Sequence, residues 1–239
     1  MRLAVPAILP SSHADLKEKL ALLVDAPGLE RIQIDVVDGK FAEPACWPYT
    51  APLEMRERVE KGEMLPHPDR ISYEVDLMCV DPETAAAEWL SLGARRLTFH
   101  AETTTDLPHL LSFAKEHYGA GGDFATDLVS FGVAINLGSD LNLIESVLGE
   151  VSYVQFMGIA RIGRQGQPLD ERVFEKIRVF HERHPEVPIQ VDGGVTLENT
   201  KKLLALGVTN LIVGSAIAHA DNPAHTLQAF EDLKNTYGV

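Results

Sequence analysis

Short apolar segments alternate with longer amphipathic segments eight times along the chain, and this alternation constrains the fold more than any other feature. Short apolar runs are typical of buried strands, and the stretches between them are long enough to be helices. Each unit spans about 30 residues, which suits a crossover between parallel strands. The predicted strands are Leu3–Leu9, Arg31–Val37, Ile71–Met78, Arg96–His100, Ser130–Asn136, Tyr153–Gly158, Pro188–Val191 and Asn210–Val213. The predicted helices are Asp15–Val24, Leu53–Val59, Pro82–Leu92, Leu107–His117, Leu141–Leu148, Glu171–Arg183, Leu197–Leu206 and Pro223–Tyr237.

Eight such units in 239 residues predict one α/β domain over residues 1–239, closed into a (β/α)8 TIM barrel. Strands such as Leu211–Val213 are apolar on both faces, as parallel strands covered on both sides are. An open, doubly wound parallel sheet is the main alternative. Lys61–Asp69 contains two prolines and Tyr118–Asp127 is rich in Gly and Asp, so both segments are predicted loops.

The composition argues against several kinds of binding partner and cellular location. The net charge of −14 argues against a nucleic-acid groove and against binding to an anionic membrane. Cys46 and Cys79 are too few for a disulfide framework, which favours a reduced, cytoplasmic protein. No run approaches the roughly 18 apolar residues of a membrane span. The N-terminal apolar run is short and contains Pro6, so we interpret it as a first strand rather than a signal peptide.

Acidic residues stand at several predicted strand ends. The active face of a TIM barrel lies at the carboxyl ends of its strands, and Asp35, Asp76 and Asp192 are at or near such ends. Gln33, Asp35 and Asp76 share the same parity and are expected to face one cavity. Three carboxylates together require a raised pKa or a bound cation, and oxygen ligands suit Mg²⁺, Mn²⁺ or Ca²⁺. Alternatively, one or two of these acids cap loops and never meet; Asp38, before Gly39, is the best candidate for such a turn.

The last quarter of the chain contains two glycine-bearing turns that are typical of a phosphate-binding site. Gly193 and Gly194 follow the seventh predicted strand, and Gly214 and Ser215 follow the eighth. Loops at these two places commonly form the phosphate site of a TIM barrel, because glycines let backbone N–H groups approach the phosphate oxygens. Either dipeptide alone is a common turn.

The segment 158–170 is a candidate closing loop beside that pocket. In it Arg161 or Arg164 can make a bidentate contact with a phosphate, although a solvated surface loop is an equal alternative. We further expect Gly166, with Met78 and Met157 at strand ends, to line the substrate site.

Histidines elsewhere have simpler explanations. His181 and His184 are three residues apart near a helix end, which is a possible metal pair but is more typical of a surface. His100 and Glu102 end the fourth predicted strand and can hydrogen-bond in the cavity, yet a local structural pair is favoured.

These residues together resemble the ribulose-phosphate 3-epimerase family over nearly the whole chain. The resemblance implies a TIM barrel of the ribulose-phosphate-binding type and an isomerase that epimerises a pentulose 5-phosphate through a 2,3-enediolate held by a divalent metal. It places the two catalytic aspartates at Asp35 and Asp192, which would act as opposed base and acid. It also implies a homo-oligomer without an organic cofactor. The motifs that carry it are Val5–Leu9, Gln33–Phe41, Glu74–Met78, Thr98–Glu102, Asp192–Val195 and Gly214–Ile217.

The chain departs from the family pattern around the metal. The two metal-binding histidines of the family correspond to Gln33 and Asp76, and its first-strand serine corresponds to Ala7. The candidate metal ligands are therefore Gln33, Asp35, Asp76 and Asp192, an oxygen set that favours Mg²⁺ or Mn²⁺ over Zn²⁺ or Fe²⁺. The loop Ala160–Gln167 carries a one-residue insertion relative to the family.

Three functional hypotheses remain open from the sequence. The first is a pentulose-phosphate epimerase, or a related isomerase with another sugar phosphate. The second is a barrel that binds a phosphosugar without turnover, which the retained aspartates disfavour. The third is decarboxylation of a keto-sugar acid phosphate, whose Asp-x-Lys-x-x-Asp motif is absent from the sequence.

Overall fold

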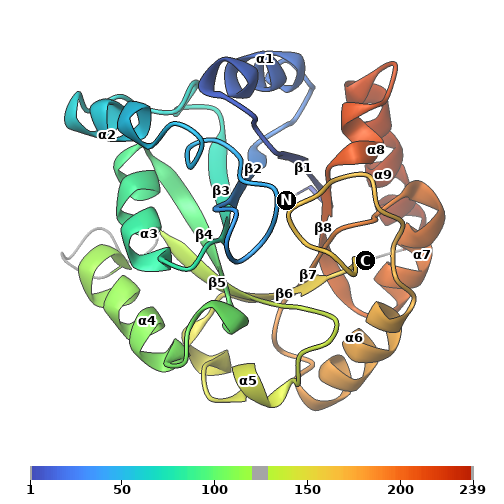
Figure 1. Cartoon of the computed structure of the whole chain (residues 1–239). Coiled ribbons are helices and arrows are strands. Elements are labelled where there is room, and N and C mark those ends of the chain that lie inside the picture. Colours follow the sequence, from blue (N-terminus) through green and yellow to red (C-terminus); the bar gives the residue numbers. More distant parts are fainter. Residues whose placement is uncertain (1, 120–128, 238–239) are drawn as a thin grey trace.

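Eight parallel strands pair in chain order and close on themselves, since β1 pairs with both β2 and β8. The computed structural model describes residues 2–119 and 129–237. Helices form a ring outside the strands (Figure 1), which confirms the predicted TIM barrel and excludes the open sheet. The strands are β1 (Ala4–Ile8), β2 (Arg31–Val37), β3 (Ser72–Met78), β4 (Ala94–His100), β5 (Ser130–Ile135), β6 (Tyr153–Met157), β7 (Ile189–Asp192) and β8 (Val208–Val213).

Every predicted helix has a counterpart, although two are shorter than expected by more than one residue. The helix predicted over Leu107–His117 ends at Ala114 and continues as a π-helical turn. The helix predicted over Leu141–Leu148 is reduced to Asn142–Glu145, and a 3-10 turn that contains Gly149 follows it at Leu148–Glu150. The helix α8 was not predicted, because four residues are too few to show a periodic pattern. The helices are α1 (His13–Leu23), α2 (Pro52–Glu60), α3 (Pro82–Ser91), α4 (Leu107–Ala114), α5 (Asn142–Glu145), α6 (Arg172–Arg183), α7 (Leu197–Ala205), α8 (Ser215–Ala218) and α9 (Pro223–Tyr237).

The two predicted loops differ in outcome. Residues 61–69 form no helix or strand, as the two prolines predict. Of the predicted loop Tyr118–Asp127, Tyr118 belongs to the π-helical turn Lys115–Gly119, and residues 120–127 lie outside the described part of the chain.

Apolar side chains fill the space between the strands and the helices. The Phe156 and Phe180 rings, from β6 and α6, pack edge to face at 5.2 Å. Trp89 on α3 and Trp47 make a similar contact at 5.7 Å. These aromatic side chains are fully buried, so the outer shell is held mainly by the hydrophobic effect.

The inside of the barrel, by contrast, is lined by polar side chains. Successive inward positions of β2 are Arg31, Gln33 and Asp35, and β3 contributes Glu74 and Asp76 beside them in register. The remaining inward polar residues come from β4, β6, β7 and β8: Arg96, Thr98, His100, Tyr153, Gln155, Gln190, Asp192 and Asn210. Burying polar groups is costly unless they hydrogen-bond to one another, so the partners of these side chains determine how the interior is stabilised.

Gly132 makes room for the largest of these interior side chains. A Cβ at Gly132 on β5 would lie 2.2 Å from the Tyr153 ring, which occupies that space. The ring is covered by the Arg96 guanidinium at 3.8 Å, and the Tyr153 hydroxyl lies 2.7 Å from Thr98 Oγ1. The absence of a side chain on β5 therefore allows the Tyr153 ring of β6 to lie over β5 and reach Thr98 on β4.

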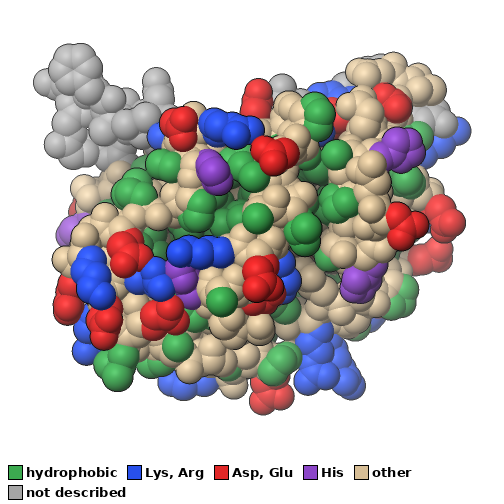
Figure 2. All heavy atoms as spheres, turned by 90° about the horizontal axis from the view of Figure 1, so that it is seen from above, with side chains coloured by type: hydrophobic (Ala, Val, Ile, Leu, Met, Phe, Trp, Pro, Cys, Tyr) green, Lys and Arg blue, Asp and Glu red, His purple; other side chains and the backbone are tan. Residues whose placement is uncertain are grey.

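The surface carries charges of both signs. Figure 2 shows the side of the molecule at the top of Figure 1, where Lys and Arg are interspersed with Asp and Glu and form no continuous basic face. Within residues 2–119 and 129–237, no helix has the length and apolar character needed to cross a bilayer.

Candidate active site

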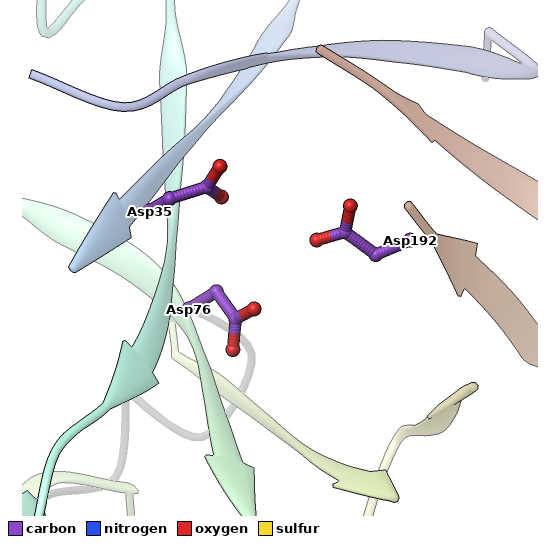
Figure 3. A group of neighbouring side chains, drawn as sticks. All are labelled: Asp35, Asp76 and Asp192. Carbon is purple, nitrogen blue, oxygen red and sulfur yellow. The ribbon is translucent and has the colours of Figure 1, made fainter. Parts of the chain in front are cut away.

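Three aspartates meet at the carboxyl ends of the strands. Asp35 comes from β2, Asp76 from β3 and Asp192 from β7, and each offers a carboxylate oxygen within 4.8 Å of the others. Figure 3 shows Asp35 and Asp76 on adjacent strands, with the Asp192 carboxylate pointing toward them from across the barrel. We call these three residues the acid cluster. The alternative that these acids cap separate loops and never meet is wrong for all three.

The amide of Gln33 connects two members of the acid cluster. Gln33 Nε2 donates to Asp35 Oδ1 at 2.9 Å and to Asp192 Oδ2 at 2.7 Å. Gln33 lies two residues before Asp35 on β2, so both side chains point into the barrel. Its other amide atom, Oε1, is buried without a hydrogen-bond partner among the described residues.

Burial and mutual repulsion raise the pKa of both connected acids. Burial, then the charge of Asp76, raises the pKa of Asp35 to about 7. Burial and the neighbouring charge of Asp35 raise the pKa of Asp192 well above its ordinary value. Two carboxylates this close repel each other when both are ionised, so each holds its proton to a higher pH than an exposed aspartate does.

Asp76 has a different set of partners. Its Oδ1 lies 3.0 Å from His100 Nε2, and its Oδ2 accepts from Gln155 Nε2 at 3.1 Å. Burial opposes protonation of His100, but the charge and hydrogen bond of Asp76 outweigh it and raise the pKa of the imidazole. His100 Nδ1 is 3.9 Å from Glu102, whose Oε1 instead accepts from the Asn136 backbone N–H at 2.8 Å. The expected local pair of His100 and Glu102 is thus secondary to the contact of His100 with Asp76.

A cavity opens above the acid cluster, and the predicted substrate-site residues line it. Gly193 and Gly194 have positive φ angles of 100° and 71°, and a Cβ at Gly194 would lie 2.3 Å from the Leu169 backbone nitrogen. Only glycine therefore fits at Gly194. The lining includes these predicted residues: Asp35, Met78, Met157, Arg164, Gly166, Asp192, Gly193, Gly194, Gly214 and Ser215.

The segment 158–170 forms one wall of this cavity. Arg164 lines it, and its Nε donates to the backbone oxygen of Glu43 at 3.0 Å, whereas Arg161 is not a lining residue. Gln165, which was not predicted, extends over Gly214 and donates weakly to Ala7 O and to Asp35 Oδ2, both at 3.4 Å.

A profile of the ribulose-phosphate 3 epimerase family matches residues 3–218. The chain belongs to this family. The ribulose-5-phosphate-3-epimerase of Arabidopsis thaliana chloroplasts is 29% identical over 238 residues, covering 98% of this chain and 78% of the relative. The ribulose-phosphate 3-epimerase of Aquifex aeolicus is 27% identical over 221 residues, covering 91% of this chain and 90% of the relative. The family is one of isomerases, so the prediction of an isomerase of this kind is confirmed.

Solved structures that resemble the chain support the fold alone. The 3-hexulose-6-phosphate synthase of Salmonella typhimurium superposes with a TM-score of 0.66 at 16% identity, covering 99% of this chain and 100% of that one. The thiamine phosphate pyrophosphorylase of Pyrococcus furiosus gives 0.61 at 18% identity, covering 98% and 96%. These identities are too low to transfer an activity.

The acid cluster of this family member is suited to a divalent cation. Among the described residues, it is the group of His, Cys, Asp and Glu side chains that can hold a metal ion. The buried, unpartnered Oε1 of Gln33 is the kind of atom that a cation satisfies, although Nε2 is the amide atom that faces the acids. All candidate ligands are oxygens, which fits a hard ion.

Two other groups are structural. Asp38 Oδ1 accepts from the backbone N–H groups of Lys40 and Phe41, and its Oδ2 accepts from that of Val80, so it fixes a turn as expected. His184 Nε2 lies 3.0 Å from Glu145, while His181 packs against Gly207. The two histidines therefore have separate neighbours.

Sequence reasoning missed Gln155 and Gln165 and undervalued His100. Gln155 has a signal that could have been used, because a glutamine inside the apolar run Tyr153–Met157 shares parity with Met157. Gln165 has none, since its place depends on the path of an irregular loop.

Proposed function

We propose that this chain epimerises a pentulose 5-phosphate at C3, with Asp35 and Asp192 as the two acid–base residues. The observation that carries the proposal is that one amide, Gln33, hydrogen-bonds both carboxylates beside a glycine-lined cavity. One acid with a raised pKa and one ionised acid are the pair that proton transfer at a carbon needs. Membership of an epimerase family supports the same reaction.

The chemistry follows from the placement of the two acids. Asp35 and Asp192 reach the cavity from β2 and β7, on different sides of the barrel (Figure 3). The ionised member takes the C3 proton from one face of the sugar, and the protonated member returns a proton to the other face. A product with inverted C3 leaves the two acids with exchanged protonation states, so the reverse reaction uses the same pair.

We propose that the phosphate lies against Gly193, Gly194, Gly214 and Ser215, whose backbone N–H groups serve as donors. Arg164 and Gly166 cover that end, while Met78 and Met157 line the cavity nearer the acid cluster. A phosphate held there fixes the distance from the anchor to C3, which selects the length of the sugar.

We also propose that Asp35, Asp76 and Asp192 hold Mg²⁺ or Mn²⁺ in preference to Zn²⁺ or Fe²⁺, and that Gln33 joins them as a ligand when its amide turns to present Oε1 in place of Nε2. A cation at this place supplies electrostatic stabilisation to negative charge that develops on the sugar oxygens. The support is the donor set, which is made of oxygens alone, without the imidazoles that favour zinc. Equilibrium dialysis against each ion, with the metal measured in the protein, tests the preference.

The remaining parts of the proposal concern context. We propose a homo-oligomer in the cytoplasm that uses no organic cofactor. The exposed fractions of Leu22 on α1 and Leu53 on α2 are 73% and 69%, which favours their burial in an interface between copies. Both cysteines are free and buried, as in a reducing compartment. Sedimentation velocity measures the oligomeric state.

Proton exchange at C3 tests the reaction. Ribulose 5-phosphate is incubated with the protein in D2O, with Mg²⁺ or Mn²⁺ added, and deuterium at C3 is measured by NMR. We expect wild-type exchange, a loss of about 10²- to 10⁴-fold in Asp192→Asn, and no change in Asp232→Asn, an exposed acid on α9. Stabilisation by ribulose 5-phosphate without wild-type exchange would instead identify a binding protein that lacks turnover.

A further inference from the structure

A line of hydrogen bonds crosses the barrel from Glu74 to Asp76 by way of two glutamines. Gln190 Nε2 donates to Glu74 Oε1 at 2.5 Å and to Gln155 Oε1 at 2.8 Å. Gln155 Nε2 then donates to Asp76 Oδ2 at 3.1 Å. All four side chains have no exposed surface. We call Gln190 and Gln155 the amide pair.

The Glu74 end fixes the direction of the line. Arg96 Nε donates to Glu74 Oε2 at 3.1 Å, and Arg31 Nε lies 3.5 Å from the same oxygen, so Glu74 is an acceptor. Gln190 must therefore present its NH2 group to Glu74, and its second N–H goes to Gln155 Oε1. The Oε1 of Gln190 is left without a partner, as expected when both N–H groups are committed.

This direction determines what Gln155 presents to the active site. Because Gln155 Oε1 is occupied by Gln190, only its NH2 group remains for Asp76. His100 holds the other oxygen of Asp76 at 3.0 Å. Each carboxylate oxygen of Asp76 thus accepts one hydrogen bond, which fixes its rotation, and each keeps a further lone pair.

We propose that Gln155 and Gln190 are positioning residues that orient the Asp76 carboxylate as a ligand for a hard divalent cation, with Glu74 as the anchor. The inference rests on the proposed metal site. Metal-binding carboxylates are characteristically held by hydrogen bonds from residues behind them, and losing such a partner weakens metal affinity about 10- to 100-fold. Here the holding groups are carboxamides anchored about one barrel layer below the cation.

Binding of Mn²⁺ in the absence of substrate tests the proposal. Mn²⁺ is titrated into the full-length protein, and free Mn²⁺ is measured by electron paramagnetic resonance. Gln155→Met removes the donor while nearly conserving volume, and we expect the Mn²⁺ dissociation constant to rise about 10- to 100-fold. Gln190→Met, at a residue whose side-chain amide donates to Glu74 and Gln155 rather than to the acid cluster, should also raise this dissociation constant because Gln155 is then free to turn.

Thr98→Val is the matched control. Thr98 is buried beside Asp76 on the neighbouring strand β4, and its side chain hydrogen-bonds to Glu74 and Tyr153 but not to Asp76, so the Mn²⁺ affinity of this variant should match that of the wild type. Circular dichroism verifies that each variant is folded. Should Gln155→Met fail to fold, Gln155→Asn takes its place with the same expectation, since the shorter amide withdraws the donor.

The outcomes separate this inference from the proposed reaction. Wild-type affinity in folded Gln155 and Gln190 variants, or a wild type that binds no Mn²⁺, overturns the positioning role. Exchange at C3 of ribulose 5-phosphate is measured on the same wild-type preparation. If the wild type catalyses exchange and the variants bind Mn²⁺ as the wild type does, the positioning role of the amide pair is rejected and the epimerase proposal stands. If the wild type binds Mn²⁺ but catalyses no exchange, the epimerase proposal is rejected, and the Mn²⁺ affinities of the variants alone decide the role of the amide pair.

Discussion

Buried carboxylates in the barrel interior have opposite surroundings at Glu74 and at the pair Asp35 and Asp192. Glu74, one layer below the acid cluster, faces the guanidinium groups of Arg31 and Arg96 and the amide of Gln190. Asp35 and Asp192 face each other, with only the neutral amides of Gln33 and Gln165 as donors. The same fold thus compensates one carboxylate with cations and leaves two others in mutual repulsion.

The difference indicates what each region is for. Charge that is paired in the interior contributes to a unique fold, while charge left unpaired is costly and persists where chemistry uses it. The Glu74 region lies toward the amino-terminal end of the strands, where a TIM barrel is structural, and the acid cluster lies at the carboxyl end, where such barrels react. Replacing a carboxylate by an amide should therefore have opposite effects on stability in the two regions.

The largest expected effect is that of Glu74→Gln. The change keeps the shape of the side chain but leaves Arg31 and Arg96 without their anionic partner in the interior. We expect the free energy of unfolding to fall by about 4 kcal/mol. Urea denaturation followed by circular dichroism measures it. A loss well under 1 kcal/mol would show that the arginines reach solvent and that the two regions do not differ as argued.

Asp35→Asn should have the opposite sign, and its effect should depend on pH. The folded-state pKa of Asp35, about 7, is above the unfolded value, so the native state binds more protons between about pH 4 and 7. Wild-type stability should therefore decrease as the pH rises through this range, by on the order of 3 kcal/mol. The asparagine variant should be flatter and more stable than the wild type at pH 8.

This comparison is made with a chelator present, because a bound cation would itself stabilise the ionised cluster. Thermal melts of the wild type and Asp35→Asn are recorded from pH 4 to pH 8. Parallel stability curves for the two proteins would mean that Asp35 titrates at its ordinary value and that the acid cluster is solvated.

The smallest expected change in stability is that of Gly132→Ala, which tests how tightly the Glu74 region is packed. A Cβ at this position would meet the Tyr153 ring, which contacts Arg96 and Thr98 in the Glu74 region. We expect a loss of about 2 kcal/mol in the free energy of unfolding, as in other overpacked cores. Gly138→Ala serves as the control, since a Cβ there meets nothing. Equal stability of the two variants would contradict the crowding at Tyr153.

Much of the fold was predictable because its signals are local. The strand Arg31–Val37 and the helix Pro223–Tyr237 were predicted with their observed bounds, since apolar runs and amphipathic periods identify such elements. β8 was less predictable: it begins at Val208, two residues before the predicted start at Asn210, because the polar Thr209 separates Val208 from the apolar run that follows. Asn210 Oδ1 accepts from Arg31 Nη2 at 2.7 Å, a contact that reaches from β2 across the intervening strand β1.

The residues of the candidate site also fall into those that local sequence signals predicted and those that they did not. Asp35, Asp76 and Asp192 were predicted from their places at strand ends, and the glycines from their places in the two closing loops. His100 was interpreted as the partner of Glu102 two residues away, whereas its shorter contact is to Asp76 on another strand. Proximity in the sequence was a poor guide because a closed barrel brings every inward residue of a layer within reach of the others.

The sequence by itself determined the eight-fold alternation, the strand-end acids and the glycine turns, since each depends on neighbours within a few residues. Only the tertiary structure decided that Gln33 hydrogen-bonds to Asp192, 159 positions away in the chain, as well as to Asp35, and that two glutamines connect Asp76 to a buried ion pair. The physical reason is that burial removes water as a hydrogen-bond partner. Each interior donor must then find an acceptor across the barrel, and closure of the sheet alone determines which acceptor is near.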